Sequence, residues 1–150
     1  MKVLITGGAG YIGSVLTEVL LNKGYQVTVL DNLIYKQTSV APFSYHPNFN
    51  FILGDVRDES LLKPLVESHD VIIPLAAIVG FPACKADPQL AWEINYNQIK
   101  NILDVIDDHH IILYPNTNSG YGVGEDGIYC TEESANQKVN NLSGHQFYFS

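Results

Sequence analysis

The sequence predicts an α/β fold, a parallel β-sheet covered by helices on both faces. Short apolar runs typical of buried strands alternate with amphipathic helical patterns, and a glycine-rich turn joins the first strand to the first helix. A strand that is buried on both faces is a nearly continuous apolar run, and these segments have that character. We expect about five strands, near residues 2–6, 26–30, 49–53, 70–74 and 110–114.

The turn after the first strand is the most informative segment. Residues 6–13 form the sequence TGGAGYIG and open a helix. Gly7 would permit a tight turn, Gly10 would let backbone approach a phosphate, and Gly13 would let the helix pack against the strand. This pattern predicts a Rossmann-type site for the pyrophosphate of a dinucleotide.

The first helix is predicted over residues 11–23. Backbone amides from Tyr11 and Ile12 onward would face the pyrophosphate at the positive end of the helix dipole. Gly24 follows the last periodic residue and is expected to stop the helix. One apolar face is predicted, formed by Ile12, Leu16, Val19 and Leu20.

The second strand ends at Asp31, which Asn32 follows. Asp31 lies about eighteen residues after Gly13, near the spacing at which a carboxylate binds the ribose hydroxyls of adenosine. A carboxylate there would repel a 2′-phosphate, so we expect NAD rather than NADP as the cofactor. The alternative is that Asp31 and Asn32 only begin a polar loop.

Two further helices continue the alternation of strands and helices. Asp58 can cap a short helix, and Asp87 and Pro88 open a longer one. Asn95 is a polar residue within the apolar stripe of the longer helix, and a buried amide needs partners, so we expect a structural or cofactor-facing hydrogen bond there. The apolar positions are Leu61, Leu62, Leu65 and Val66 in the shorter helix, and Leu90, Ala91, Ile94, Ile99, Ile102, Leu103 and Ile106 in the longer one.

Length and composition indicate one domain. A chain of 150 residues lies near the usual domain size. A net charge of −8 with only eight Lys and Arg residues argues against nucleic acid and anionic membranes as partners, because both require a basic patch. Cys84, Cys130 and the histidines lack metal-ligand spacing, and the cysteines form no disulfide framework, which favours a reducing cytoplasm. We recognise no signal peptide and no membrane-spanning run.

Residues 1–134 resemble the extended short-chain dehydrogenase/reductase family and, within it, the NAD-dependent nucleotide-sugar epimerases and dehydratases. The motifs that carry the resemblance are TGGAGYIG at 6–13, Asp31-Asn32-Leu33, Gly54-Asp55-Val56-Arg57, Leu75-Ala76-Ala77, Asn95, and the segment 117–122 that ends in Tyr121-Gly122. The resemblance implies an NAD-binding Rossmann domain over residues 1–134, with the strand order 3-2-1-4-5. The remaining residues, 135–150, are interpreted from their composition as a polar tail.

The resemblance also implies ligand contacts at two strand ends. Asp55 and the backbone amide of Val56 would read the edge of the adenine ring, whereas the alternative role of Asp55 is to cap the helix that follows it. Small side chains over residues 75–77, the Leu75-Ala76-Ala77 motif, would leave room for the cofactor at the end of the fourth strand. Pro74 stands where family members commonly carry a histidine.

Thr117 is the candidate catalytic residue. It lies four residues before Tyr121, where the family has a Ser or Thr whose hydroxyl binds the reacting oxygen of the substrate. The alternative is a turn hydroxyl in a loop that is rich in Asn, Ser and Gly.

Catalysis in the family also needs a Tyr hydroxyl beside a Lys four positions later, on the next helix. An isolated phenol has a pKa of about 10 and a nearby ammonium must lower it. No such pair follows Tyr121 in this sequence. Tyr96 and Lys100 have the spacing, but they precede the fifth strand on the polar side of the longer helix, so we interpret them as part of a solvated face.

The end of the sequence shows no pattern for the helix that should carry this pair. Residues 136–146 have no apolar stripe of sufficient length, so we expect an incomplete sheet and a truncated or altered end. The apolar surface left over strands four and five would then be covered by a homodimer, a swapped segment or the aromatic residues 147–149.

Two functions are therefore predicted, and both involve NAD. In the first, the chain is the NAD-binding portion of a nucleotide-sugar epimerase or dehydratase, with little or no turnover of its own. In the second, it is a non-catalytic NAD-binding sensor or interaction module. A third interpretation is an unrelated flavodoxin-like domain, which would bind FMN rather than NAD.

Overall fold

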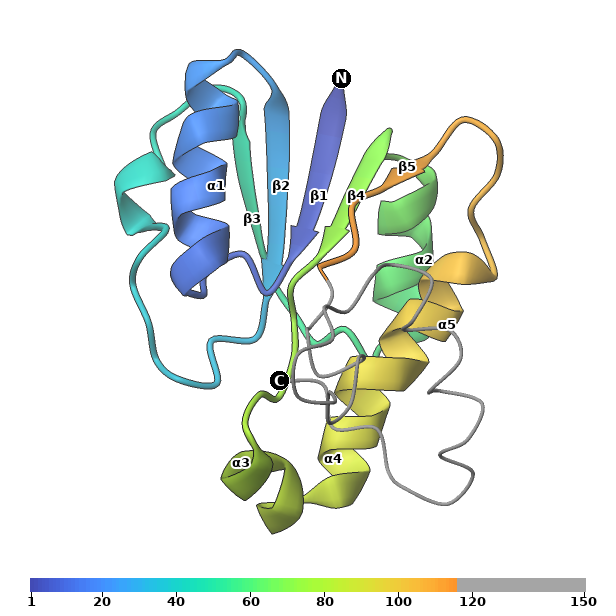
Figure 1. Ribbon diagram of the computed structural model, residues 1–150. Helices are drawn as coiled ribbons and strands as arrows, with labels where there is room; N and C mark the ends of the chain where they lie inside the picture. Colours follow the sequence, from blue (N-terminus) through green and yellow to red (C-terminus); the bar gives the residue numbers. More distant parts are fainter. Residues whose placement is uncertain (116–150) are drawn as a thin grey trace, which may run out of the picture.

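The computed structural model describes residues 1–115, which form a five-stranded parallel sheet with helices on both faces (Figure 1). The strands are β1 (Lys2–Thr6), β2 (Gln26–Asp31), β3 (Phe49–Leu53), β4 (Val71–Pro74) and β5 (Ile111–Ile112). The helices are α1 (Tyr11–Asn22), α2 (Glu59–Glu67), α3 (Phe81–Ala86), α4 (Pro88–Trp92) and α5 (Gln98–Leu103), with a 3-10 turn η1 (Ala41–Phe43) and a π-helical turn η2 (Glu93–Asn97).

The strand order is β3-β2-β1-β4-β5, as predicted, and all neighbouring strands are parallel. The chain moves outward from β1 to β3 and then crosses back to β4, so the loops after β1 and β4 leave the sheet in opposite directions. In open α/β sheets this point is where ligands bind. Thr6 pairs in register with Leu30 on one side and Pro74 on the other, which brings the carboxyl ends of three strands to one line.

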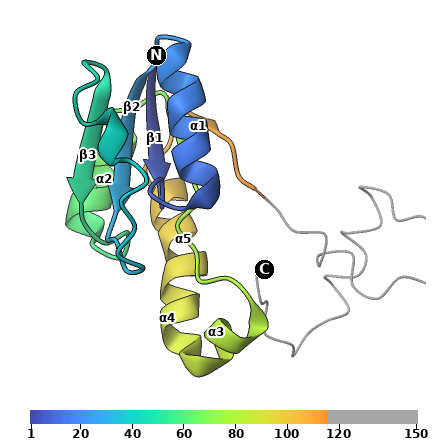
Figure 2. The same ribbon diagram turned by 90° about the vertical axis from the view of Figure 1, so that its left-hand side faces the viewer.

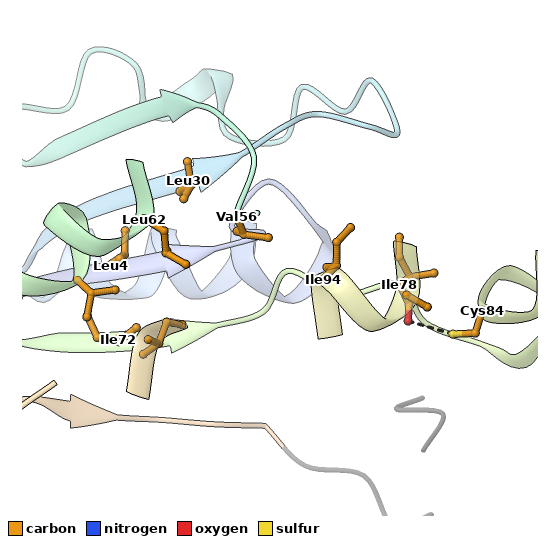
Figure 3. Close-up of a cluster of buried hydrophobic side chains, with 11 residues drawn as sticks. Leu4, Leu30, Val56, Leu62, Ile72, Ile78, Cys84 and Ile94 are labelled. Atoms are coloured by element: carbon orange, nitrogen blue, oxygen red, sulfur yellow. Dashed lines mark hydrogen bonds between the residues drawn. The ribbon is translucent and has the colours of Figure 1, made fainter. Parts of the chain in front are cut away.

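The two faces of the sheet are covered by different helices. Figure 2 shows α1 on one side of the sheet and α2 on the other, and α5 lies beside α2 (Figure 1). Successive residues of a strand point to opposite faces, so Leu4 packs toward α2 and α5, whereas Val3 and Ile5 pack toward α1. Figure 3 shows the core on the α2 side, which continues past the sheet to Ile78 and Cys84.

The predicted apolar face of α1 is wrong in part. Ile12 and Val19 are 63% and 44% exposed, whereas the positions buried against the sheet are Gly13, Thr17 and Leu21. The helix lies very close to the glycine turn, so small residues face the sheet there, and the large apolar side chains are rotated outward. Leu16 and Leu20, also predicted in this face, are partly buried against the core.

The shorter helix is confirmed. Asp58 is the N-cap of α2, and its carboxylate accepts hydrogen bonds from the amides of Ser60 and Leu61. Leu62 and Val66 are fully buried, and Leu61 and Leu65 pack against them.

The longer predicted helix is not continuous. It is divided into α4, η2 and α5, and it ends at Leu103 rather than near Ile106. Leu103 is 55% exposed because it lies about 100° around the helix from the buried Ile102. Helix α3 was not predicted, and β5 is shorter than the expected run 110–114. Thr117, the Tyr121-Gly122 segment and the tail 135–150 lie outside the described residues.

Within residues 1–115, no helix is long and apolar enough to cross a membrane. The same part of the chain holds no group of three or more His, Cys, Asp or Glu side chains arranged to bind a metal ion.

Candidate functional site

The loops that leave the carboxyl ends of β1, β2, β3 and β4 line two adjoining hollows that share six lining residues and that we describe together as one groove. Its middle is lined by the glycine turn and by the exit of β4, namely Gly7, Gly10, Tyr35, Leu75, Ala76 and Ala77. One end, which we name the Asp31 end, is lined by Asp31, Asn32, Gln37, Gly54 and Val56. The other, which we name the Gln98 end, is lined by Pro74, Val79, Asn95, Gln98, Ile99 and Tyr114, and here the walls are mainly apolar.

Every predicted cofactor residue except one lines this groove. The glycine-turn residues Tyr11, Ile12 and Gly13 face its middle. Asp55 instead lines a neighbouring hollow, together with Arg57, Asp58 and Glu93. The groove thus brings together predicted cofactor-binding residues from motifs that lie far apart in the sequence.

The glycine turn has little room for side chains except on its groove side. Gly7 has a φ of +67°, and a Cβ there would lie 2.5 Å from the backbone nitrogen of Ala76. A Cβ on Gly13 would lie 2.5 Å from Gly8, so the third glycine allows helix and turn, rather than helix and strand, to approach closely. A Cβ on Gly10 would meet only the Gly7 carbonyl, at 3.2 Å, so its backbone is open toward the groove.

Asp31 holds the glycine turn in place. It is 6% exposed, and its Oδ2 accepts a hydrogen bond from the Ala9 amide at 3.0 Å while Oδ1 accepts one from the Leu33 amide at 2.8 Å. The Ser39 hydroxyl donates to the Ala9 carbonyl at 2.5 Å. A carboxylate accepts about four hydrogen bonds in all, so Asp31 keeps capacity for hydroxyl groups of a ligand.

Gln37 supplies a sign that a polar ligand fits at the Asp31 end. Its Oε1 is buried and has no hydrogen-bond partner among the described residues, although the side chain lines the groove. A buried acceptor without a partner is unfavourable, and a ligand that brings a donor would relieve it. The open Gly10 backbone and the Asp31 carboxylate lie along the same groove, so these residues fit a ligand with both phosphate and hydroxyl groups.

Asp55 is engaged by Arg57. Its Oδ1 accepts from Arg57 Nε at 3.0 Å and from the Arg57 amide at 2.9 Å, and its Oδ2 accepts from Arg57 Nη2 at 2.8 Å. Asn32 adds a longer bond at 3.3 Å. These hydrogen bonds, led by the Arg57 side chain, lower the pKa of Asp55 to about 2 despite partial burial. The carboxylate therefore stays ionised at neutral pH.

The capping alternative for Asp55 is wrong, because Asp58 is the residue that caps α2. The contact of Asp55 and Val56 with adenine stays a prediction. The same guanidinium also reaches across to the turn η2, where Arg57 Nη1 lies 3.1 Å from Glu93 Oε2.

Two carboxamides hold the chain after β4. Asn95 Oδ1 accepts from the Ile78 amide and its Nδ2 donates to the Ile78 carbonyl, both at 2.8 Å. The prediction of a hydrogen-bonded Asn95 is thus confirmed in its structural form. Gln98 donates from Nε2 to the Ala76 carbonyl at 2.6 Å and accepts at Oε1 from the Thr6 hydroxyl at 2.9 Å.

Tyr96 and Lys100 lie on the outer face of the helix, as predicted. Tyr96 is 45% exposed and its ring stacks on Trp92 with centroids 4.4 Å apart. Lys100 is exposed. Neither residue lines the groove, so their spacing does not form a catalytic pair.

Sequence reasoning missed several residues that position the site. Gln98 carried a signal, since it lies three residues after Asn95 and falls on the same helix face. Arg57 carried a weaker one, as a cation two residues after Asp55. Ser39 carried none, because its bond to Ala9 joins segments thirty residues apart.

Comparison with known proteins adds to this geometry. A profile of the NAD dependent epimerase/dehydratase family matches residues 3–146. The chain is 35% identical over 124 residues to a UDP-N-acetyl-alpha-D-glucosaminuronate decarboxylase of Bacillus cytotoxicus, covering 82% of this chain and 38% of that protein. It is 31% identical over 152 residues to the CDP-paratose 2-epimerase of Salmonella typhi, covering 97% and 45%.

A solved structure with the same architecture is the UDP-glucuronic acid 4-epimerase of Bacillus cereus in complex with UDP-glucuronic acid and NAD. Its TM-score is 0.76 at 27% identity, and the match covers 95% of this chain and 50% of that one. The dTDP-glucose 4,6-dehydratase of Bacillus anthracis in complex with NAD gives a TM-score of 0.74 at 25% identity, covering 89% and 43%. The chain thus spans about half the length of these relatives, or less.

Proposed function

Because the chain belongs to the NAD dependent epimerase/dehydratase family, we propose that it is the NAD-binding portion of a nucleotide-sugar epimerase or dehydratase. The observation that carries this proposal is the groove across the carboxyl ends of four strands, with the open glycine turn in its middle and a buried carboxylate at one end. We take the NAD-binding unit to be residues 1–134.

In this proposal each end of the groove has a distinct task. Asp31 binds the ribose hydroxyls of adenosine, and backbone amides at the start of α1 face the pyrophosphate. The apolar walls of the Gln98 end take the nicotinamide half, and Leu75 with its neighbouring alanines leaves space for it. Bound NAD would supply the hydride acceptor for oxidation of a sugar. The Asp31 carboxylate would exclude NADP, because it repels a 2′-phosphate.

We propose further that the 150-residue polypeptide binds NAD with little or no turnover. Its sequence after β5 contains no Tyr followed four residues later by Lys, and a lone phenol is a poor base at neutral pH. The second candidate function is a non-catalytic NAD-binding sensor or interaction module. Thr117 would contribute a hydroxyl to a bound nucleotide sugar in the first candidate but not in the second.

Calorimetric titration of the 150-residue chain with NAD and with NADP tests the cofactor assignment. We expect NAD to bind at least about tenfold more tightly than NADP, which corresponds to roughly 1.4 kcal/mol. Binding of neither nucleotide, or of FMN alone, would contradict the proposal.

Titration with UDP-sugars and dTDP-sugars, in the presence of NAD, separates the two candidate functions. Binding of a nucleotide sugar without a change in nicotinamide absorbance supports the incomplete enzyme, and no binding supports the sensor. Steady turnover would overturn the non-catalytic assignment and leave NAD binding intact.

We also propose a homodimer. Large apolar side chains are exposed at the β5 edge, where Ile111 and Leu113 are 50% and 54% exposed, and on the outer face of α4 and α5, where Trp92 is 50% exposed. Apolar surface of this kind is a common interface between subunits. Sedimentation equilibrium is expected to give twice the mass of the chain, and a monomer at high concentration would contradict the dimer.

A further inference from the structure

Gln98 is a buried carboxamide in the floor of the Gln98 end. It is 2% exposed, and it lies one turn of helix from each of the buried apolar residues Ile94 and Ile102. A carboxamide buried among apolar side chains is unfavourable unless its oxygen and its amino group both have partners. Its contacts therefore show which parts of the molecule it holds.

Those contacts join three elements. The Gln98 Nε2 donates to the carbonyls of Ala76, at 2.6 Å, and of Ile94, at 2.9 Å, while Oε1 accepts from the Thr6 hydroxyl. The Thr6 oxygen in turn accepts a longer bond from the Ala76 amide at 3.4 Å. Both backbone polar groups of Ala76 are therefore held by buried side chains, one from β1 and one from α5.

Ile78, two residues after Ala76, is likewise held by a buried carboxamide. Asn95, on the turn η2, holds both backbone polar groups of Ile78. Residues 76 and 78 thus direct their backbone polar groups toward buried side chains, and one residue lies between them. That residue is Ala77, which lines the middle of the groove.

We propose that Gln98 is a positioning residue for the nicotinamide half of the cofactor. It fixes Ala76, together with Thr6, so that the backbone of Ala77 is presented to the ribose and carboxamide groups at that end. The inference rests on the proposed function, because it takes the adenosine half to lie at the Asp31 end. It adds a residue outside every motif in which the family resemblance was found.

The test compares NAD with ADP, which has the adenosine and both phosphates but no nicotinamide half. In Gln98→Met we expect the affinity for NAD to fall about tenfold while the affinity for ADP stays unchanged. Gln89→Met is the matched control, since Gln89 is an exposed glutamine on α4 whose side chain binds only Glu93 among the contacts of the described residues. It should change neither affinity.

A second pair of variants keeps the test valid if Gln98→Met does not fold. Thr6→Val removes the hydroxyl that binds Gln98 with little change of shape, whereas Thr6→Ser retains it. The ratio of NAD to ADP affinity should fall in Thr6→Val and be kept in Thr6→Ser. Circular dichroism and a thermal melt establish that each variant is folded before titration.

The outcomes separate this inference from the proposed function. An equal loss of NAD and ADP binding in folded Gln98→Met, or no loss of either, would overturn the positioning role. If the wild-type chain bound neither nucleotide, the proposed function itself would fail. A loss confined to NAD, in both Gln98→Met and Thr6→Val, supports the inference.

Discussion

A hollow with polar residues in its lining lies at each end of the sheet, but the polar side chains have different partners at the two ends. At the amino end a hollow is lined by Lys2, Thr28, Asn48, Ser68 and His69 among others, and His69 binds the Thr28 hydroxyl at 2.8 Å and the Leu65 carbonyl at 2.6 Å. Ser68, which also binds the Leu65 carbonyl, lies 3.2 Å from His69 Nδ1, so His69, Thr28 and Ser68 bind one another or nearby backbone.

At the carboxyl end the polar side chains hold the loops and leave other groups facing the groove. Asp31 fixes Ala9 while Gly10 beside it stays open, and Gln98 fixes Ala76 while Ala77 lines the groove. A polar hollow is therefore not sufficient to indicate a site. What distinguishes the carboxyl end is that buried polar side chains hold the loops, while neighbouring groups remain available to a ligand.

Gly7→Ala is expected to have the largest effect on the carboxyl end of the sheet. The new Cβ would lie 2.5 Å from the Ala76 backbone, and the residue has a φ of +67°. We expect NAD binding to weaken by about 100-fold or more, because turn and β4 exit would be displaced together. The left-handed backbone alone should lower the free energy of unfolding by about 1–2 kcal/mol. Calorimetry and urea unfolding measure the two effects.

Gly24→Ala is the matched control. Gly24 also has a positive φ, +82°, but a Cβ there would meet nothing within 4 Å. It should lose only the stability that a left-handed backbone costs an alanine, about 1–2 kcal/mol, and retain NAD affinity. Equal loss of binding in both variants would show that the Gly7 effect is global unfolding rather than damage to the site.

Asp31→Asn removes the charge at the Asp31 end and keeps one acceptor oxygen for the turn. We expect NAD to bind about tenfold more weakly, because hydrogen bonds to a charged acceptor are the stronger ones. The preference for NAD over NADP should shrink, since a neutral amide does not repel a 2′-phosphate. Titration with both nucleotides measures this, and an undiminished preference would place the selectivity elsewhere.

Arg57→Met tests how much the contact between Arg57 and Asp55, at the carboxyl end of the sheet, contributes to the free energy of unfolding. The folded pKa of Asp55 is about 2, below its ordinary value of 3.8, so this carboxylate contributes stability above pH 3.8 that is lost as the pH falls toward 2. Without the guanidinium the Asp55 pKa should return toward its ordinary value. Urea unfolding between pH 5 and 2 should then show a smaller acid-dependent loss of stability than in the wild type.

His69→Gln tests the amino end and should have the smallest effect. Burial, the main cause, lowers the pKa of His69 below its ordinary value of 6.5. The unfolded chain therefore takes up a proton before the folded one, and stability falls as the pH drops below 6.5 until the folded histidine also titrates. The variant should lack this decline and bind NAD as the wild type does. A change in NAD affinity would contradict the assignment of the amino end as purely structural.

The sequence allowed the sheet and the Asp31 end of the groove to be predicted because their signals are local. The glycine turn and the N-cap at Asp58 each follow from short runs of residues with one physical requirement, whereas the strand order was implied by the family resemblance. The same holds for Asp31, whose position at the end of an apolar run places it beside the turn.

The remaining features depend on contacts between distant segments, which no local pattern contains. The face of α1 was mispredicted because Gly13 and Thr17 are small and carry no strong apolar signal, although close packing brings them against the sheet. The role of Gln98 depends on Ala76 and Thr6, which lie 22 and 92 residues away. The π-helical turn likewise leaves no recognisable signature in the residues that form it.

The guanidinium of Arg57 bonds two carboxylates at once, Asp55 beside it and Glu93 on the first residue of η2. Its planar, forked array of five donors makes this double attachment feasible, and a lysine ammonium on a single flexible stem would reach one carboxylate at a time. Exchange of Arg57 for lysine would therefore weaken the link between the loop after β3 and the turn that carries Asn95. The two carboxylates, Asp55 and Glu93, together constrain both the length of this loop and the type of cation at position 57.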